Sequence, residues 1–208
     1  MKSARFSAHL LWLVGSLSIA SHAASLDSAP VAGSGMLAQA GGSVEERIRG
    51  SAGRMTAYRK LLVDPDANVR LAALDEMIKS NDAAVRELAF ESGFSSADST
   101  LRALTLRGRL MATKTLVFEL VNSKNLPAED WEKSLKTFGS DRQVIHNLEV
   151  NPATNDVKFN GGTGRLSGQE LTLTYANGSM RLRLSDGAVM VGTSTYHGVT
   201  LPVRLVLQ

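Results

Sequence analysis

The sequence predicts an α+β protein in which short antiparallel helices are followed by an antiparallel β-meander, either a single sheet or a small sandwich. Two observations predict this class. Between residues 66 and 106 a short motif recurs every sixteen residues, and each copy has the apolar spacing of a helix. After residue 112, alternating apolar and polar runs are separated by Asn-Gly and Asp-Gly pairs, which are typical of hairpins.

The start of the chain has the pattern of a secretory signal peptide. Lys2 and Arg5 precede an apolar stretch over residues 10–20, and small residues then mark a cleavage site near Ala23. A membrane anchor, the alternative, needs about 20 apolar residues, and this stretch is shorter. We therefore expect a signal peptide over residues 1–23 and a mature chain that is periplasmic or secreted.

Charge and cysteine content exclude several classes of function. The chain has 23 basic and 20 acidic residues, and removal of the signal leaves 21 basic residues against the same 20 acidic ones. Nucleic-acid binding needs concentrated positive charge, so no nucleic-acid partner is expected. The absence of cysteine excludes disulfides, thiolate catalysis and a lipidated N-terminal cysteine. No later segment is apolar enough to span a membrane, so no span is expected in the mature chain.

Residues 24–43 are rich in Ala, Gly and Ser and contain few large side chains. Such a composition cannot bury enough apolar surface to offset the entropy lost on ordering. We therefore expect a flexible linker over residues 24–43. Helical repeats over residues 44–112 and a β-rich domain over residues 113–208 would follow it.

The three copies of the repeat share an Asp, an apolar residue three positions later and an Arg one position after that. An Asp at the start of a helix accepts hydrogen bonds from unpaired N–H groups of the first turn. Each copy therefore predicts one helix of about three turns, packed antiparallel to the next, and a degenerate fourth copy is expected near Gly50–Tyr58. The structural repeat positions are Asp66, Arg70, Asp82, Arg86, Asp98 and Arg102.

The segment Asp64-Pro65-Asp66-Ala67-Asn68-Val69-Arg70-Leu71-Ala72-Ala73 resembles the second helix of HEAT and HEAT-like repeats. The resemblance covers residues 54–111, roughly a third of the chain. It implies an α-solenoid fragment, and such fragments usually act in scaffolding and protein binding. Solenoids generally need about three or more repeats to bury a continuous core. We therefore expect this short array to pack against the C-terminal half.

The C-terminal half is predicted to contain one helix within a meander. Residues 115–121 predict a strand, and residues 126–138 predict a helix with acids in its first turn and lysines near its end. From residue 143 onward we expect about five or six strands. The glycine-rich segment 161–168 leads into a strand and lacks the Lys of a phosphate-binding loop, so it is interpreted as a hairpin loop. Pro202 predicts an edge strand or a bulge.

No catalytic or metal-binding motif is recognisable. Only His146 and His197 remain after removal of the signal, far apart in the sequence, whereas zinc takes three or four close-set ligands and a serine triad needs an oriented base. No catalytic residues, metal or cofactor are therefore expected. The repeat arginines would suit an acidic partner or phosphate. Because each arrives with its own Asp, pairing between repeats is the favoured interpretation.

The sequence thus favours a non-enzymatic exported envelope protein, a protein–protein interaction or scaffold module with another envelope protein as its partner. The alternative is a carbohydrate or cell-wall binding module in the β-domain. This alternative predicts an exposed concave sheet face with aromatic residues, and Trp131, Tyr175 and Tyr196 are the aromatic residues outside the helical part that could stack on a sugar. An enzyme would instead need His146 and His197 close to acids in one pocket.

Overall fold

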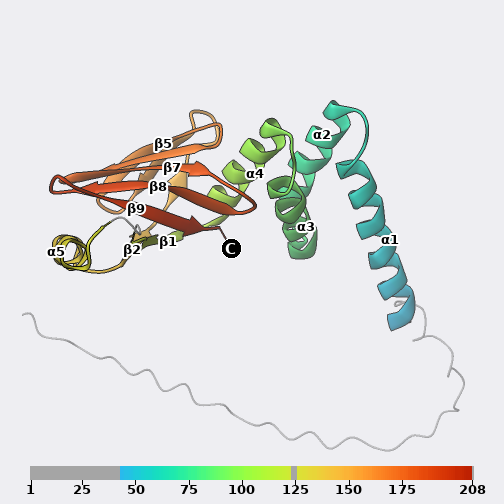
Figure 1. The fold of residues 1–208 in the computed structure, drawn as a ribbon. Helices are drawn as coiled ribbons and strands as arrows, with labels where there is room; N and C mark the ends of the chain where they lie inside the picture. The colour runs from blue at the N-terminus through green and yellow to red at the C-terminus, as the bar shows by residue number, and fades with distance from the viewer. Residues whose placement is uncertain (1–42, 123–125, 208) are drawn as a thin grey trace, which may run out of the picture. The chain divides into compact units, whose positions relative to one another are not determined.

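The computed structural model describes residues 43–122 and 126–207, which contain five helices and nine strands (Figure 1). The helices are α1 (Val44–Leu62), α2 (Ala67–Ile78), α3 (Ala83–Phe94), α4 (Ser99–Ala112) and α5 (Ala128–Phe138). The strands are β1 (Thr115–Leu120), β2 (Arg142–His146), β3 (Glu149–Val150), β4 (Asp156–Phe159), β5 (Gly162–Ser167), β6 (Glu170–Tyr175), β7 (Gly178–Leu184), β8 (Val189–Tyr196) and β9 (Val199–Val206). The predicted α+β class with a C-terminal antiparallel meander is confirmed. The predicted signal peptide, and the predicted linker apart from Ser43, lie outside the described residues.

Helices α2, α3 and α4 begin at the three repeated aspartates. Asp66, Asp82 and Asp98 are the N-cap residues, and each carboxylate accepts a hydrogen bond from the backbone N–H two residues later, at 2.8–2.9 Å. These bonds satisfy N–H groups that have no partner within the helix. The constant interval in the sequence is therefore the interval between successive helix starts.

Helix α1 does not begin where a fourth repeat copy would place it. Ser43 and Glu46 form a reciprocal capping box, so the helix begins at Val44 and runs through Gly50 and Gly53. The fourth copy expected near Gly50 is thus wrong, and Ser43 caps a helix although it was predicted to end the linker. Within residues 43–122 and 126–207, no helix has the length and apolar character needed to cross a membrane.

The strands of the described residues form a single antiparallel sheet in the order β2-β1-β9-β8-β7-β6-β5-β4-β3. Strands β2 and β3 are consecutive in the chain yet lie at opposite edges. The chain bends between them at Asn147, which has a φ of 56°. Beside this bend, the N–H of Asn160 donates to the carbonyl of His146 at 3.0 Å. The sheet is therefore curled into a half-barrel whose inner face is buried.

The sheet differs from the sequence prediction at two places. Gly162–Ser167, expected to be a hairpin loop, is strand β5 and pairs with both β4 and β6. A Cβ at Gly162 would lie 2.4 Å from both the Phe159 ring and the carbonyl oxygen of Thr174, and one at Gly164 would lie 2.3 Å from the carbonyl oxygen of Thr172. Glycine therefore allows the neighbouring backbone of β6 and large side chains to approach this strand closely. Pro202 is not at an edge, since β9 lies between β1 and β8, but it lies just beyond the end of β1.

The helices and the sheet share one core. Phe90, Phe94, Leu106 and Leu110 of α3 and α4 are buried in the same cluster as the inner side chains of the sheet. Residues from Ser43 onward accordingly form one compact unit rather than two separate domains. A second, smaller cluster lies among α1, α2, α3 and α4. The expectation that the short helical array packs against the C-terminal half is therefore correct.

Candidate interaction surface

One face of α1 carries an apolar stripe, interrupted by Ser51, that the rest of the described residues covers only in part. We define the α1 stripe by the residues spaced four and three positions apart: Val44, Ile48, Ser51, Met55, Tyr58 and Leu62. At about 100° per residue these positions share one helix face. No residue of α1 is fully buried, which sets this helix apart from α2, α3 and α4.

The two halves of the α1 stripe have different surroundings. Met55, Tyr58 and Leu62 are partly buried against the small core among the helices. Val44 and Ile48 are each 62% exposed. The N-terminal half of the stripe thus extends beyond the helices that cover its C-terminal half, and its apolar side chains are exposed to solvent. Contiguous exposed apolar surface of this kind is typical of interaction sites.

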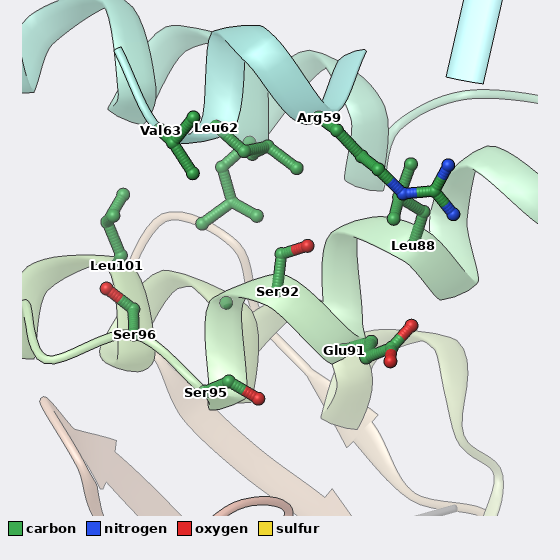
Figure 2. A pocket seen from close by; sticks show the side chains of 11 residues that line it. Arg59, Leu62, Val63, Leu88, Glu91, Ser92, Ser95, Ser96 and Leu101 are labelled. Carbon is green, nitrogen blue, oxygen red and sulfur yellow. The ribbon is translucent and has the colours of Figure 1, made fainter. Parts of the chain in front are cut away.

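Two grooves flank the covered half of α1. The first groove, with a volume of about 520 Å³, lies among Leu62, Val63, Leu88 and Leu101 and is bordered by Arg59. Figure 2 shows the side chains of Leu62, Val63 and Leu101 gathered around it. The second groove, of about 640 Å³, includes Tyr58 and Leu61 of α1 and Met77 of α2. The first groove is lined about equally by apolar and polar side chains and the second mainly by apolar ones, and the linings of both include residues of the covered half of α1.

The repeated arginines bind mainly to backbone carbonyls. Arg70 donates to the carbonyl of Asp64 at 2.7 Å, and Arg86 donates to that of Ser80 at the same distance. The ion pairs of the described residues include only one of the three arginines, Arg70, which lies 3.8 Å from the carboxylate of Asp98. The arginines are therefore used within the fold, and their arrangement offers no row of free guanidinium groups to phosphate.

The residue two positions before each capping Asp is a repeat position that the sequence analysis missed. Asp64, Ser80 and Ser96 each accept a hydrogen bond from the N–H of the following Asp, at 2.9–3.1 Å. The sequence does contain this pattern, because all three residues have short side chains with an oxygen and recur at the same sixteen-residue interval. Together with the arginines they fix the loops between successive helices.

The third copy of the repeat attaches the helices to the sheet. Arg102 occupies the same repeat position as Arg86, but it donates to the carbonyl of Ser185 in the turn between β7 and β8. From the same helix, Arg107 donates to the carbonyl of Pro152. In addition, the amide of Gln169 donates to the carbonyl of Ser99 at 3.3 Å. One end of the helical array is thus bound to the sheet, and α1 forms the other end.

The predicted aromatic residues contribute to the core of the sheet. Tyr175 donates to or accepts from the hydroxyl of Ser194 at 2.9 Å, and the ring of Tyr196 lies 5.8 Å from that of Phe138. Trp131 is half-buried against the same core. Within the described residues these rings form no exposed platform.

The two histidines do not take part in a metal-binding cluster. His146 is exposed at the end of β2, and His197 lies in the turn between β8 and β9 with a φ of 47°. In residues 43–122 and 126–207 no group of three or more His, Asp or Glu side chains is placed to hold a metal ion.

The outer face of the sheet is held by a cross-strand charge network. Glu119 on β1 accepts hydrogen bonds from Arg204 on β9 at 2.8 Å and from Arg142 on β2 at 3.4 Å. The hydrogen bond and the positive charge of Arg204 lower the pKa of the Glu119 carboxyl below its ordinary value of 4.5. The Glu119 side chain is partly exposed, and neither groove described above includes it.

In comparisons with known proteins, no protein-family model and no curated protein matches the chain.

Proposed function

We propose that this chain is a non-enzymatic, exported envelope protein that acts as a protein–protein interaction or scaffold module. The observation that carries the proposal is the α1 stripe, in whose exposed half Val44 and Ile48 are each 62% exposed. The sequence resemblance to HEAT-like repeats supports it further, since stacked helices commonly present protein-binding surfaces.

The binding surface in this proposal is the α1 end of the helical array. The opposite end is occupied by the sheet, which buries Leu106 and Leu110 of α4. End helices of repeat arrays need a polar outer face to remain soluble alone, whereas α1 presents Val44, Ile48 and Leu61 to solvent. A partner that covers these side chains would remove apolar surface from water, at about 25 cal/mol per Å².

The test compares two Val→Asp substitutions at exposed positions. Val44→Asp changes the α1 stripe, and Val191→Asp changes the outer face of β8, where the valine is 44% exposed. Purified protein is used to capture partners from an envelope extract. A partner retained by the wild type and by Val191→Asp but lost with Val44→Asp and with Ile48→Asp supports the proposal. Recovery of no stable partner, or equal retention by all variants, contradicts it.

Export is tested separately from binding. We propose that the signal peptide is cleaved near Ala23, so the protein recovered from the periplasm or the medium begins at or near Ala24. Mass spectrometry of the N-terminal peptide measures this directly. Uncleaved protein in the cytoplasm would reject the export part and leave the α1 surface as a separate question.

A further inference from the structure

The charges beside the α1 stripe are distributed unequally. At about 100° per residue, Arg47 and Arg54 both lie along one flank of the stripe, whereas Glu45 lies along the other. Both arginines are exposed. The exposed half of the stripe therefore has a basic border on one side only.

Pairing within the helix increases this difference. Glu45 is held by Arg49 at 2.7 Å, so the flank that carries the acid is neutralised. The ion pairs of residues 43–122 and 126–207 include neither Arg47 nor Arg54. Two positive charges beside exposed apolar side chains favour a partner that brings negative charge to the same border.

The spacing of the stripe favours a helix as that partner. Alternation of four- and three-residue steps keeps an apolar seam facing a neighbouring helix. The covered half of this same seam already packs against helices, through Met55, Tyr58 and Leu62. A helix beside Val44, Ile48 and Ser51 would extend the array by one member and leave the existing contacts in place.

A second copy of this chain fits the surface less well. In an antiparallel pair of α1 helices, a two-fold axis brings each flank against the same flank of the other molecule. Arg47 and Arg54 would then face their own counterparts, and like charges at such positions are destabilising. In a parallel pair Arg54 would lie opposite Arg59. Self-association is therefore opposed by charge in both directions.

We propose that the N-terminal half of α1 binds an amphipathic helix of another protein, with apolar residues facing Val44 and Ile48 and acidic residues along the flank that faces Arg47 and Arg54. This inference rests on the proposed interaction function and names the chemistry of the partner. The apolar contact supplies most of the affinity, and the two arginines select the charge of the partner.

The experiment uses two synthetic helices, each three heptads long with Leu at the seam positions. One carries Glu at every flanking position and the other carries Lys, so neither pairs with itself. Binding to the purified protein is measured by fluorescence anisotropy. The Glu helix is expected to bind about three- to tenfold more tightly than the Lys helix, as for two exposed ion pairs. Added salt should reduce the difference.

Variants separate the charge from the stripe. The double change Arg47→Glu and Arg54→Glu is expected to reverse the preference, and Ile48→Asp is expected to abolish binding of both helices. The matched control is Arg181→Glu with Arg183→Glu, two exposed positions of β7, and it should leave the preference unchanged.

Three results would overturn the inference: no binding of the Glu helix, equal binding of the two helices, or a preference that survives the change of Arg47 and Arg54. Self-association that Ile48→Asp removes, measured by sedimentation velocity, would overturn it in favour of a second copy. In each case the proposed function stands or falls separately, through the Val44→Asp and Ile48→Asp capture experiment with envelope extract.

Discussion

The two ends of the helical array differ in what covers their apolar faces. At one end, α4 buries Leu106 and Leu110 completely and directs Arg102 to a turn of the sheet. At the other end, α1 carries an apolar stripe of similar character whose first members, Val44 and Ile48, remain in solvent. An apolar helix face of the same kind is thus buried in the core at one end of the array and partly exposed to solvent at the other.

The largest difference between the two ends is expected from removal of apolar side chains. Leu106→Ala leaves a cavity in a core residue that is 0% exposed, and such changes cost about 2–5 kcal/mol. Ile48→Ala removes a side chain that the fold does not use, so its effect should stay within about 0.5 kcal/mol. Urea unfolding followed by circular dichroism measures both values.

Equal destabilisation by these two substitutions would contradict the comparison, because it would mean that the fold itself buries the α1 stripe. The slope of the urea transition serves as the control. It should be unchanged in Ile48→Ala, since no compact part of the described residues would lose its structure.

A second contrast concerns glycines within the helices. A Cβ at Gly93 of α3 would lie 1.9 Å from the hydroxyl of Thr105 on α4, whereas a Cβ at Gly53 of α1 meets nothing within 4 Å. Gly93→Ala should therefore destabilise by about 1–3 kcal/mol through overpacking. Gly53→Ala should instead stabilise α1 by up to about 1 kcal/mol. Both are measured by urea unfolding.

The contact with Thr105 can be tested with a double-mutant cycle. Combining Gly93→Ala with Thr105→Ala removes the hydroxyl but keeps a Cβ that lies 2.9 Å from the new methyl group. A partial recovery of stability is expected, and strict additivity of the two changes would rule out this contact as the cause.

The elements predicted well from the sequence are those fixed by neighbouring residues. The starts of α2, α3 and α4 follow from Asp66, Asp82 and Asp98, because each carboxylate bonds to N–H groups within its own first turn. The alternating run of β7 likewise gives its buried face directly. Local hydrogen bonds and local periodicity need no knowledge of the rest of the fold.

The elements predicted poorly depend on residues far away in the chain. Gly162 and Gly164 of β5 are needed because carbonyls of β6 and large side chains approach them closely, and the order of residues in the sequence does not show such an approach. Arg102 reaches a carbonyl in a turn far along the sequence, although Arg86 at the same repeat position bonds locally. The α1 stripe was visible in the spacing of Val44, Ile48 and Met55, but the expected fourth repeat placed a helix start within it.

Two arginines at equivalent repeat positions, Arg86 of α3 and Arg102 of α4, allow a third comparison, between a bond within the helical array and a bond to the sheet's turn. Arg86→Gln removes a bond to the carbonyl of Ser80, within the loop before α3, and Arg102→Gln removes a bond to the carbonyl of Ser185, in the turn between β7 and β8. Both guanidinium groups are partly exposed, so each loss is expected to cost about 1 kcal/mol. The two variants should lose similar amounts of unfolding free energy, but the backbone that becomes less stable should lie in different places.

Amide hydrogen exchange shows where the backbone becomes less stable. Arg102→Gln should increase exchange in the turn between β7 and β8, and Arg86→Gln should increase it only around residues 80–85. If Arg102→Gln left the turn unaffected, the attachment of α4 to the sheet would rest on the apolar core and on the bonds of Arg107 and Gln169.

The smallest effect is expected on the outer face of the sheet, away from both ends of the array. Because Arg204 and Arg142 lower the pKa of Glu119 below 4.5, its stabilising contribution is complete above pH 4.5 and is lost as the pH falls through the lowered value. Glu119→Gln should therefore reduce the fall in the urea midpoint between about pH 5 and about pH 3. Glu170→Gln, at an exposed β6 position without an ion pair in the described residues, is the control. If the urea midpoint falls equally in the wild type and in Glu119→Gln as the pH is lowered, this network does not stabilise the sheet. The effect is expected to be small because solvent screens the partly exposed pair.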